Sequence, residues 1–309
     1  MANSFKPPLV VIAGPTASGK SALAMELAKR LDAVLISADS RQVYRGFDIG
    51  TAKPTLSEQA EVPHRLIDVV EPTETFTAAQ FRELARAEIA QAHAQGRLPI
   101  LVGGTGLYIR TVLGGYAIPE VPPDAALREK LERLEDPHAR LAEVDPVTAA
   151  RLHPNDRVRI IRALEVFELT GKPISELQTR EESPYRSVFL ALDWPRETLY
   201  ERINQRTIQM FEMGLSDEVA ALAKRYGPDL PLLKTLGYAE TLRWQLGEIS
   251  QEEAIALIQQ NTRRYAKRQV TWFRREPDAV WLEPLRYATM QAKQDAAMAL
   301  IQETLAGSK

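Results

Sequence analysis

The chain has 309 residues, of which 45% are hydrophobic and 26% are charged, and its formal net charge is −2. This length is enough to bury a core without metals or disulfides, as one large domain or two smaller ones, and the slightly acidic balance argues against a uniformly basic nucleic-acid binder. There is no cysteine, which excludes disulfides, thiolate zinc sites, iron–sulfur clusters and a cysteine nucleophile.

Residues 1–8 lack the positive segment and long apolar run of a secretory signal. No stretch reaches about 18 uninterrupted apolar residues, the length that a membrane span needs. We therefore expect a cytoplasmic protein that does not cross a membrane.

The first third of the chain predicts alternating strands and helices. Helices are expected over the segment with Leu23, Leu27 and Leu31, which recur every four residues, and over about 77–95. Three apolar runs without alternation are typical of strands buried on both faces of a parallel sheet, namely 9–13, 34–36 and 98–102. This order predicts a doubly wound α/β sheet.

The pattern changes after about residue 120. Residues 121–184 contain no buried-strand run, and short helical stretches alternate there with breaks that contain proline or glycine. Asn155 or Asp156 is expected to cap a helix that Gly171 ends. This segment is therefore predicted to be a helical insertion.

The sheet is predicted to resume after the insertion. The apolar run 188–193 is typical of a further strand, and a long helix is expected from about residue 198. The stretch from about residue 217 to the end is predicted to be helical. We therefore expect an α/β core formed by residues 1–120 and 185–309, interrupted by a helical insertion at 121–184.

Residues 14–21 match G-x-x-x-x-G-K-[ST] at every fixed position. Glycines let the backbone N–H groups wrap around phosphate oxygens, and the following helix points its positive dipole end at the same anion. Lys20 adds a positive charge, and Ser21 is the expected Mg²⁺ ligand. The motif follows a buried strand and opens an amphipathic helix, which argues against a chance match. The sequence thus predicts a phosphate-binding loop (P-loop) for a nucleotide or another diphosphate ester, made of Gly14, Pro15, Thr16, Ala17, Ser18, Gly19, Lys20 and Ser21.

Asp39 lies just beyond the second predicted strand. The carboxyl ends of neighbouring strands in a doubly wound sheet face one crevice, so Asp39 is expected near the P-loop. A carboxylate there can accept a proton from a nucleophile or bind Mg²⁺ through water. A helix cap or turn residue explains the same position equally well.

Further segments carry a resemblance to a known family. They are 39–44, 48–54, 63–68, 103–108, 153–156, 162–165, 237–238 and 267–272. Together with the P-loop they cover roughly residues 9–275, and this part of the chain resembles the tRNA dimethylallyltransferases, the bacterial tRNA isopentenyltransferases. The resemblance implies a P-loop NTPase-like fold with a helical insertion and a helical C-terminal region. We expect a monomer.

The family moves a dimethylallyl group from dimethylallyl diphosphate to N6 of an adenosine beside the anticodon, position 37 of the tRNA, and releases diphosphate. The resemblance implies that Asp39 is the general base, that Thr105 contacts the target nucleotide, and that Arg206 reaches the diphosphate together with Lys20. From the residues alone, the Thr105 hydroxyl is better explained as a partner of its own glycine turn. Arg206 shares a helix face with Arg202, and the default explanation is a solvated charged face.

No acidic residue stands between Glu253 and Glu276, a segment that is rich in arginine and lysine. A basic helix face there predicts contacts with RNA phosphates, whereas Trp272 and Phe273 beside it are better explained as core residues than as base-stacking platforms. The adenosine is expected to leave its stack and enter the cleft. The residues expected to contact tRNA, most of them by resemblance, are Asp39, Ser40, Arg41, Gln42, Thr105, Arg128, Val158, Arg159, Ile160, Ile161, Arg162, Lys234, Gly237, Tyr238, Arg264, Lys267 and Arg268.

Three alternatives stay open at this point. A small-molecule P-loop kinase would use Asp39 to deprotonate a substrate hydroxyl. An adenylate isopentenyltransferase would take a free nucleotide as acceptor, and it would not need the insertion or the basic helix. A nucleotide-regulated RNA-binding protein would have no turnover. We favour a magnesium-dependent prenyltransferase that acts on tRNA.

Overall fold

The computed structural model describes residues 6–114, 119, 121–178 and 182–306. The chain divides into two compact units, a core of residues 1–109 with 184–309 and an insertion of residues 110–183. The insertion thus begins earlier than the predicted boundary at residue 121, inside the short helix α4 (Gly106–Val112).

The described part of the core contains one parallel sheet with the strand order β3-β2-β4-β1-β5-β6. The runs predicted as strands are confirmed, and their residues are buried almost without exception, which explains why they show no alternation. The strands are β1 (Pro8–Ala13), β2 (Ala33–Ser37), β3 (His64–Arg65), β4 (Leu98–Gly103), β5 (Arg186–Leu192) and β6 (Ala279–Leu282).

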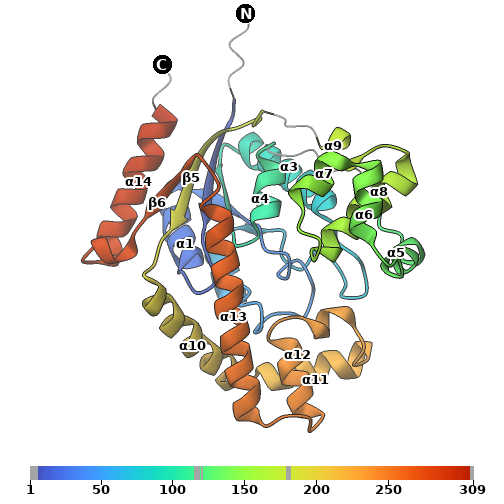
Figure 1. The fold of residues 1–309 in the computed structure, drawn as a ribbon. Helices are drawn as coiled ribbons and strands as arrows, with labels where there is room; N and C mark the ends of the chain where they lie inside the picture. The colour runs from blue at the N-terminus through green and yellow to red at the C-terminus, as the bar shows by residue number, and fades with distance from the viewer. Residues whose placement is uncertain (1–5, 115–118, 120, 179–181, 307–309) are drawn as a thin grey trace, which may run out of the picture. The chain divides into compact units, whose positions relative to one another are not determined.

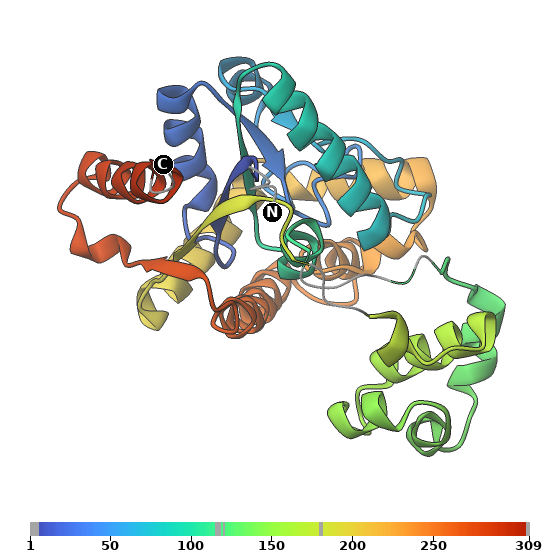
Figure 2. The ribbon, with the colours of Figure 1, turned by 90° about the horizontal axis from the view of Figure 1, so that it is seen from above.

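Two crossover helices cover opposite faces of the sheet. The chain moves from β1 to β2 through α1 (Lys20–Leu31), continues to the edge strand β3, and then returns to β4 through α3 (Ala78–Ala94). Because both crossovers are right-handed, a reversal of direction places the two helices on opposite faces. Helix α14 (Met290–Ala306) lies beside α1, as Figure 2 shows in red and blue.

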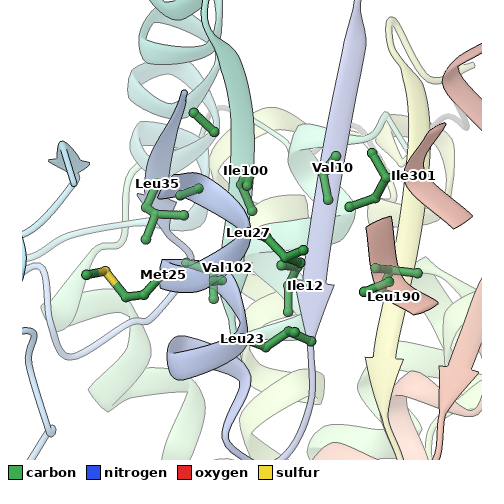
Figure 3. Packing of buried hydrophobic residues seen from close by; sticks show 14 of the residues in the cluster. Val10, Ile12, Leu23, Met25, Leu27, Leu35, Ile100, Val102, Leu190 and Ile301 are labelled. Carbon is green, nitrogen blue, oxygen red and sulfur yellow. The ribbon is translucent and has the colours of Figure 1, made fainter. Parts of the chain in front are cut away.

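The core on the α1 face is apolar and closely packed. Leu23 and Leu27 of α1 point at Ile12 and Ile100 of the sheet, and Ile301 of α14 joins them (Figure 3). The predicted spacing of four residues along α1 is therefore the spacing of its buried face. This packing fixes the start of α1, and with it the P-loop, against the carboxyl end of β1.

The C-terminal helices surround the same end of the sheet. Helices α10 (Arg196–Glu212) and α13 (Gln251–Phe273) lie side by side (Figure 1), and α11 (Leu215–Tyr226) contacts α12 (Tyr238–Gln245). Phe273 is buried and approaches Phe189 of β5 with 6.3 Å between ring centroids. It is therefore a core residue, as the sequence favours.

Two short strands were not predicted from the sequence, and one of them, β6, contradicts a prediction. Residues from 217 onward are predicted to be helical only, yet β6 pairs with β5 at the sheet edge, and β3 pairs with β2 at the opposite edge. Both runs are too short to carry a periodic signal, so only their pairing with the sheet makes them strands. No helix among the described residues is long and apolar enough to span a membrane.

The insertion has its own apolar core, which includes Ile160, Ile161 and Leu164 of α8. Gly171 ends α8 in the left-handed conformation, as predicted. Asp156 occupies the N-cap position but makes no side-chain cap, because its carboxylate accepts a hydrogen bond from Arg159 instead. The helices are α5 (Ala125–Glu132), α6 (Pro137–Val144), α7 (Pro146–Arg151), α8 (Arg157–Thr170) and α9 (Ile174–Leu177).

Glu165 is the buried charge that ties this insertion together. Arg128 donates to both of its carboxylate oxygens at 2.9 Å, Arg162 donates at 2.5 Å, and the Asp124 N–H donates at 2.7 Å. These donors hold the pKa of Glu165 below its usual value, against the opposing effect of burial. The carboxylate therefore stays charged and joins α5 to α8.

We expect Glu165→Ala to destabilise the insertion by roughly 2–3 kcal/mol, because it removes several charge-assisted hydrogen bonds and leaves a cavity. Arg128 and Arg162 are partly exposed to water, so the loss of stability is smaller than for a fully buried ion pair. Hydrogen–deuterium exchange of peptides from 121–178 measures this locally. Glu168→Ala on the same helix removes an exposed carboxylate and is the control. Equal exchange in the two variants would contradict the role of Glu165.

Candidate active site

The P-loop joins β1 to α1, and several of its N–H groups have no hydrogen-bond partner among the described residues. Gly19 precedes α1 in the left-handed conformation, with a φ of 83°, and has no side chain that could cap the helix. Ala17 also adopts a positive φ, of 62°. The first N–H groups of α1 and the remaining loop N–H groups can therefore bind an anion, which the helix dipole attracts. The exceptions are Thr16 and Ser18, whose N–H groups are paired with Gln269 Oε1 and the Pro15 carbonyl.

Two side chains, one from α10 and one from the segment just before it, donate hydrogen bonds to P-loop carbonyls. Trp194 Nε1 donates to the Ser18 carbonyl at 2.7 Å, and Arg202 Nε donates to the Ala17 carbonyl at 2.8 Å. The Arg202 guanidinium also lies over the Trp194 ring, 4.6 Å from its centroid. Arg202 thus supports the loop rather than forming a solvated charged face.

Two cations and one carboxylate meet at the P-loop. Burial lowers the pKa of Lys20 to about 8, while Asp39 raises it and Arg206 lowers it. Burial also lowers the pKa of Arg206, and Asp39 opposes this. Arg206 Nη1 lies 3.3 Å from Thr16 Oγ1, so Arg206 lies at the loop, and its predicted contact with the diphosphate stays a prediction. The excess of positive charge in this partly dehydrated place favours an anionic ligand.

Asp39 serves as a turn residue and also faces the cleft. Its Oδ1 accepts hydrogen bonds from the N–H groups of Arg41 at 2.8 Å and Gln42 at 3.4 Å. Within the described residues, Oδ2 has no hydrogen-bond partner, and Asp39 lines the same cleft as Lys20. The two explanations left open by the sequence are therefore compatible, since each uses a different oxygen.

Thr105 ties two strand ends together. Its Oγ1 accepts a hydrogen bond from the Ser40 N–H at 3.1 Å, and its own N–H donates to the Ala38 carbonyl at 3.1 Å. The residues alone favour a hydroxyl that is bonded to its own glycine turn. In the structure the hydroxyl holds the turn after β2 instead. Gly103 allows this approach, because a Cβ there would lie 2.1 Å from the Ala38 carbonyl oxygen.

Most of the P-loop, Asp39 and Arg206 line one cleft of about 1250 Å³ in the core unit, whereas Thr105 is not among its lining residues. The P-loop, Asp39 and Arg206 form its polar end. Its wall also includes apolar residues, among them Ile49, Met210, Leu236 and Ile258. A ligand with an anionic head and a small apolar part suits this lining.

A clamp holds the cleft wall formed by residues 48–50. The Glu218 carboxylate accepts hydrogen bonds from all three N–H groups of that segment, at 2.7–3.3 Å, and one from the Tyr238 hydroxyl at 2.7 Å. Tyr238 is 1% exposed. Its predicted contact with tRNA therefore has almost no side-chain surface, and Gly237 beside it is also buried.

The other predicted RNA contacts in the core unit are at the surface or in the cleft. Lys234, Arg264, Lys267 and Arg268 are exposed, and Arg268 also lines the cleft. The remaining members of the predicted set in this unit, Ser40, Arg41 and Gln42, form the turn after β2 and line the cleft as well.

In the insertion the predicted RNA contacts divide into two groups. Val158 is 82% exposed and Arg159 is exposed, whereas Ile160 and Ile161 are buried. That face of α8 packs into the apolar core, so the Ile160 and Ile161 side chains offer almost no surface, and their contact with tRNA stays a prediction. Arg128 and Arg162 both hold Glu165.

The chemistry of the donors fits Mg²⁺ bound mainly by its ligand. Among the described residues no group of three or more His, Asp or Glu side chains could enclose a metal. The Ser21 hydroxyl at the start of α1 lines the cleft. Mg²⁺ commonly takes one or two protein oxygens and completes its shell with phosphate oxygens and water. Ser21 with a bound diphosphate matches that donor set.

Three structural residues of the site were missed by the sequence analysis, namely Trp194, Glu218 and Gln269. Each acts on backbone groups far away in the chain, and a single sequence carries no signal for such pairs. Gln269 does fall within the segment 267–272 that carries the resemblance.

Comparisons with known proteins agree with this geometry. A family model described as IPP transferase matches residues 42–276, more than half of the chain. This chain belongs to the IPP transferase family. A tRNA dimethylallyltransferase from Thermosynechococcus vestitus is 50% identical, covering 96% of each chain, and one from Geobacter sulfurreducens is 51% identical, covering 90% of this chain and 92% of the relative.

Solved members of the IPP transferase family share the fold. The full-length tRNA isopentenylpyrophosphate transferase from Bacillus halodurans is 39% identical, with a TM-score of 0.73 over 98% of this chain and 99% of that one. A eukaryotic dimethylallyltransferase, described as acting on tRNA, is 29% identical, with a TM-score of 0.83 over 98% of this chain and 80% of that one. The predicted P-loop-like α/β fold and the predicted family are thereby confirmed.

Proposed function

We propose that this protein transfers the dimethylallyl group of dimethylallyl diphosphate to N6 of the adenosine at position 37 of tRNA, with release of diphosphate. The observation that carries the proposal is the cleft in which the P-loop, Lys20 and Arg206 face Asp39. Membership of the IPP transferase family supports this function over the alternatives.

The cationic end of the cleft suits a departing diphosphate. As the carbon–oxygen bond breaks, the electron pair and the negative charge move onto the diphosphate. Loop N–H groups, Lys20 and Arg206 are placed where they stabilise that charge more in the transition state than in the ground state. The P-loop then binds a leaving group, and no phosphoryl group is transferred.

Asp39 suits the acceptor half of the reaction. The N6 amine is a weak nucleophile, because its lone pair is delocalised into the purine ring. As its nitrogen bonds to the freed carbon it must lose one proton, since it would otherwise carry a positive charge. The Asp39 oxygen that has no partner among the described residues is the proposed acceptor of that proton. Thr105 holds the adjacent Ser40 backbone and so keeps this turn in place.

We assign Mg²⁺ to the Ser21 hydroxyl and the diphosphate oxygens. When bound, the ion adds positive charge to the leaving group. The exposed cations of α13, Arg264, Lys267 and Arg268, are the proposed contacts with the RNA backbone. A purine inside a stacked loop cannot reach the P-loop, so the adenosine is proposed to flip out of its stack.

Labelled dimethylallyl diphosphate, Mg²⁺ and unmodified tRNA test the function. We expect label in RNA, and none when the same tRNA carries guanosine in place of the target adenosine. Free adenylate and labelled ATP with small-molecule acceptors are run in parallel. Label in adenylate instead of RNA would favour the free-nucleotide enzyme, and a phosphorylated product without prenyl transfer would favour a kinase. Tight RNA binding without either product would favour a pure binding protein.

A further inference from the structure

Gln269 connects three parts of the site. It lies on α13, and its side chain is buried, with the residue 6% exposed. Its Oε1 accepts a hydrogen bond from the Thr16 N–H in the P-loop at 2.9 Å, and its Nε2 donates to the Gly104 carbonyl at 2.9 Å. One side chain thus satisfies two backbone groups from segments far apart in the chain.

Only a primary amide of this length does both. A carboxylate lacks the N–H donor, and an apolar side chain lacks donor and acceptor. The fit at the glycine turn is close, because a Cβ on Gly104 would lie 2.4 Å from Gln269 Nε2. The Thr16 N–H, once it is paired with Gln269, does not point at a phosphate. Gln269 therefore shapes the loop through its backbone, and it also lines the cleft.

Through Gln269, helix α13 is connected both to the P-loop, which binds the diphosphate, and to the turn that carries Asp39. Lys267 and Arg268 precede Gln269 and are exposed. Gly104 precedes Thr105, whose hydroxyl holds the Ser40 N–H next to Asp39. Helix α13 is continuous over Gln251–Phe273, so a ligand that fixes its exposed side also fixes the position of Gln269.

We propose that Gln269 is a positioning residue that couples RNA binding on α13 to diphosphate binding in the P-loop. This inference rests on the proposed function, because it takes RNA as the ligand of α13. RNA bound to α13 stabilises the arrangement in which Gln269 is hydrogen-bonded to both Thr16 and Gly104. The diphosphate binds to the P-loop in this same arrangement. By linkage, diphosphate tightens RNA binding by the same factor.

Calorimetric titration with dimethylallyl thiodiphosphate, an unreactive donor analogue, measures this coupling in the presence of Mg²⁺. The analogue is titrated into the full-length protein, with and without saturating anticodon stem-loop RNA. The ratio of the analogue's dissociation constant without RNA to that with RNA measures the coupling. In the wild-type protein we expect this ratio to be about five or more. In Gln269→Met the ratio falls to about one, because both hydrogen bonds are lost. Gln260→Met on the exposed side of α13 keeps the wild-type ratio.

Gln269→Glu is the second variant, because it keeps the size of the side chain and the acceptor for Thr16. It too is expected to lose the coupling, since it cannot donate to Gly104. In steady-state assays the KM for each substrate should rise more than kcat falls, whereas a merely structural role would lower kcat and leave both KM values and the ratio unchanged.

Equal analogue affinities with and without RNA in the wild-type protein, or a wild-type ratio in both Gln269 variants, would overturn the proposal. Prenyl transfer by the wild-type protein is measured alongside. Transfer without coupling contradicts only the role of Gln269, whereas coupling without transfer contradicts only the proposed function.

Discussion

Replacement of Asp39 by asparagine is expected to lower prenyl transfer by about 10²–10⁴-fold while tRNA binding stays near its wild-type strength, because a positioned general base contributes about that much to a rate. Asparagine keeps an oxygen for the Arg41 and Gln42 N–H groups, so the turn after β2 survives. What it loses is the negative charge that accepts the amine proton. Single-turnover transfer with saturating tRNA and donor measures the effect, and filter binding measures the RNA affinity.

Glu58→Gln is the matched control for this substitution. Glu58 also carries a carboxylate on the cleft wall, where it closes the capping box of α2 (Leu56–Glu61) with Thr55. Glutamine closes the same box, so the helix stays intact and transfer is expected to stay within about twofold. If Asp39→Asn and Glu58→Gln reacted at the same rate, Asp39 would have no role as a base.

Lys20→Met is expected to lower transfer by roughly 10²–10³-fold, because it removes a donor aimed at the charge that develops on the diphosphate. Lys29→Met on the same helix, where the side chain is exposed, is the control and should change neither transfer nor donor affinity. Rapid-quench transfer assays at saturating donor separate the rate from the binding. A wild-type rate in Lys20→Met would remove Lys20 from the reaction.

The lowered pKa of Lys20 adds a pH dependence with a definite sign. With a pKa of about 8 in the free protein, Lys20 is charged below that pH and loses its proton as pH rises above it, well before an ordinary lysine with a pKa of 10.5. The affinity for dimethylallyl diphosphate should therefore fall above pH 8, approaching about tenfold per pH unit. In Lys20→Arg the charge persists, so the same titration should be flat in this range whatever its absolute affinity. A decline of equal slope in Lys20→Arg would assign it to another group.

Local sequence patterns were enough to place the elements that have a regular apolar spacing or contain a motif. The buried strands, the helix that starts at Lys20 and the glycine at the end of α8 follow from short-range chemistry, namely the apolar runs, the four-residue spacing and the freedom of Gly171 to adopt a positive φ. Strands as short as β3 and β6 have no period of their own, and Asp156 lost its expected cap because Arg159 competes for its carboxylate.

Burial limits which side chains in the predicted RNA contacts are accessible, and the contacts themselves stay predictions. Tyr238, Ile160 and Ile161 belong to segments that resemble RNA-contacting ones, yet each packs inward. A resemblance assigns a segment to a surface, and only the packed helix decides which of its side chains faces out.

The sequence by itself determined the anion-binding loop, the layout of the sheet around it and the family, because these depend on residue type and spacing along the chain. Only the tertiary structure decided what holds that loop: Trp194, Arg202 and Gln269 grip its backbone from segments more than 170 positions away. The physical reason is that a hydrogen bond between a side chain and a distant backbone group leaves no trace in local sequence, since every residue has the same backbone groups. Such contacts exist only once the sheet has brought the segments together.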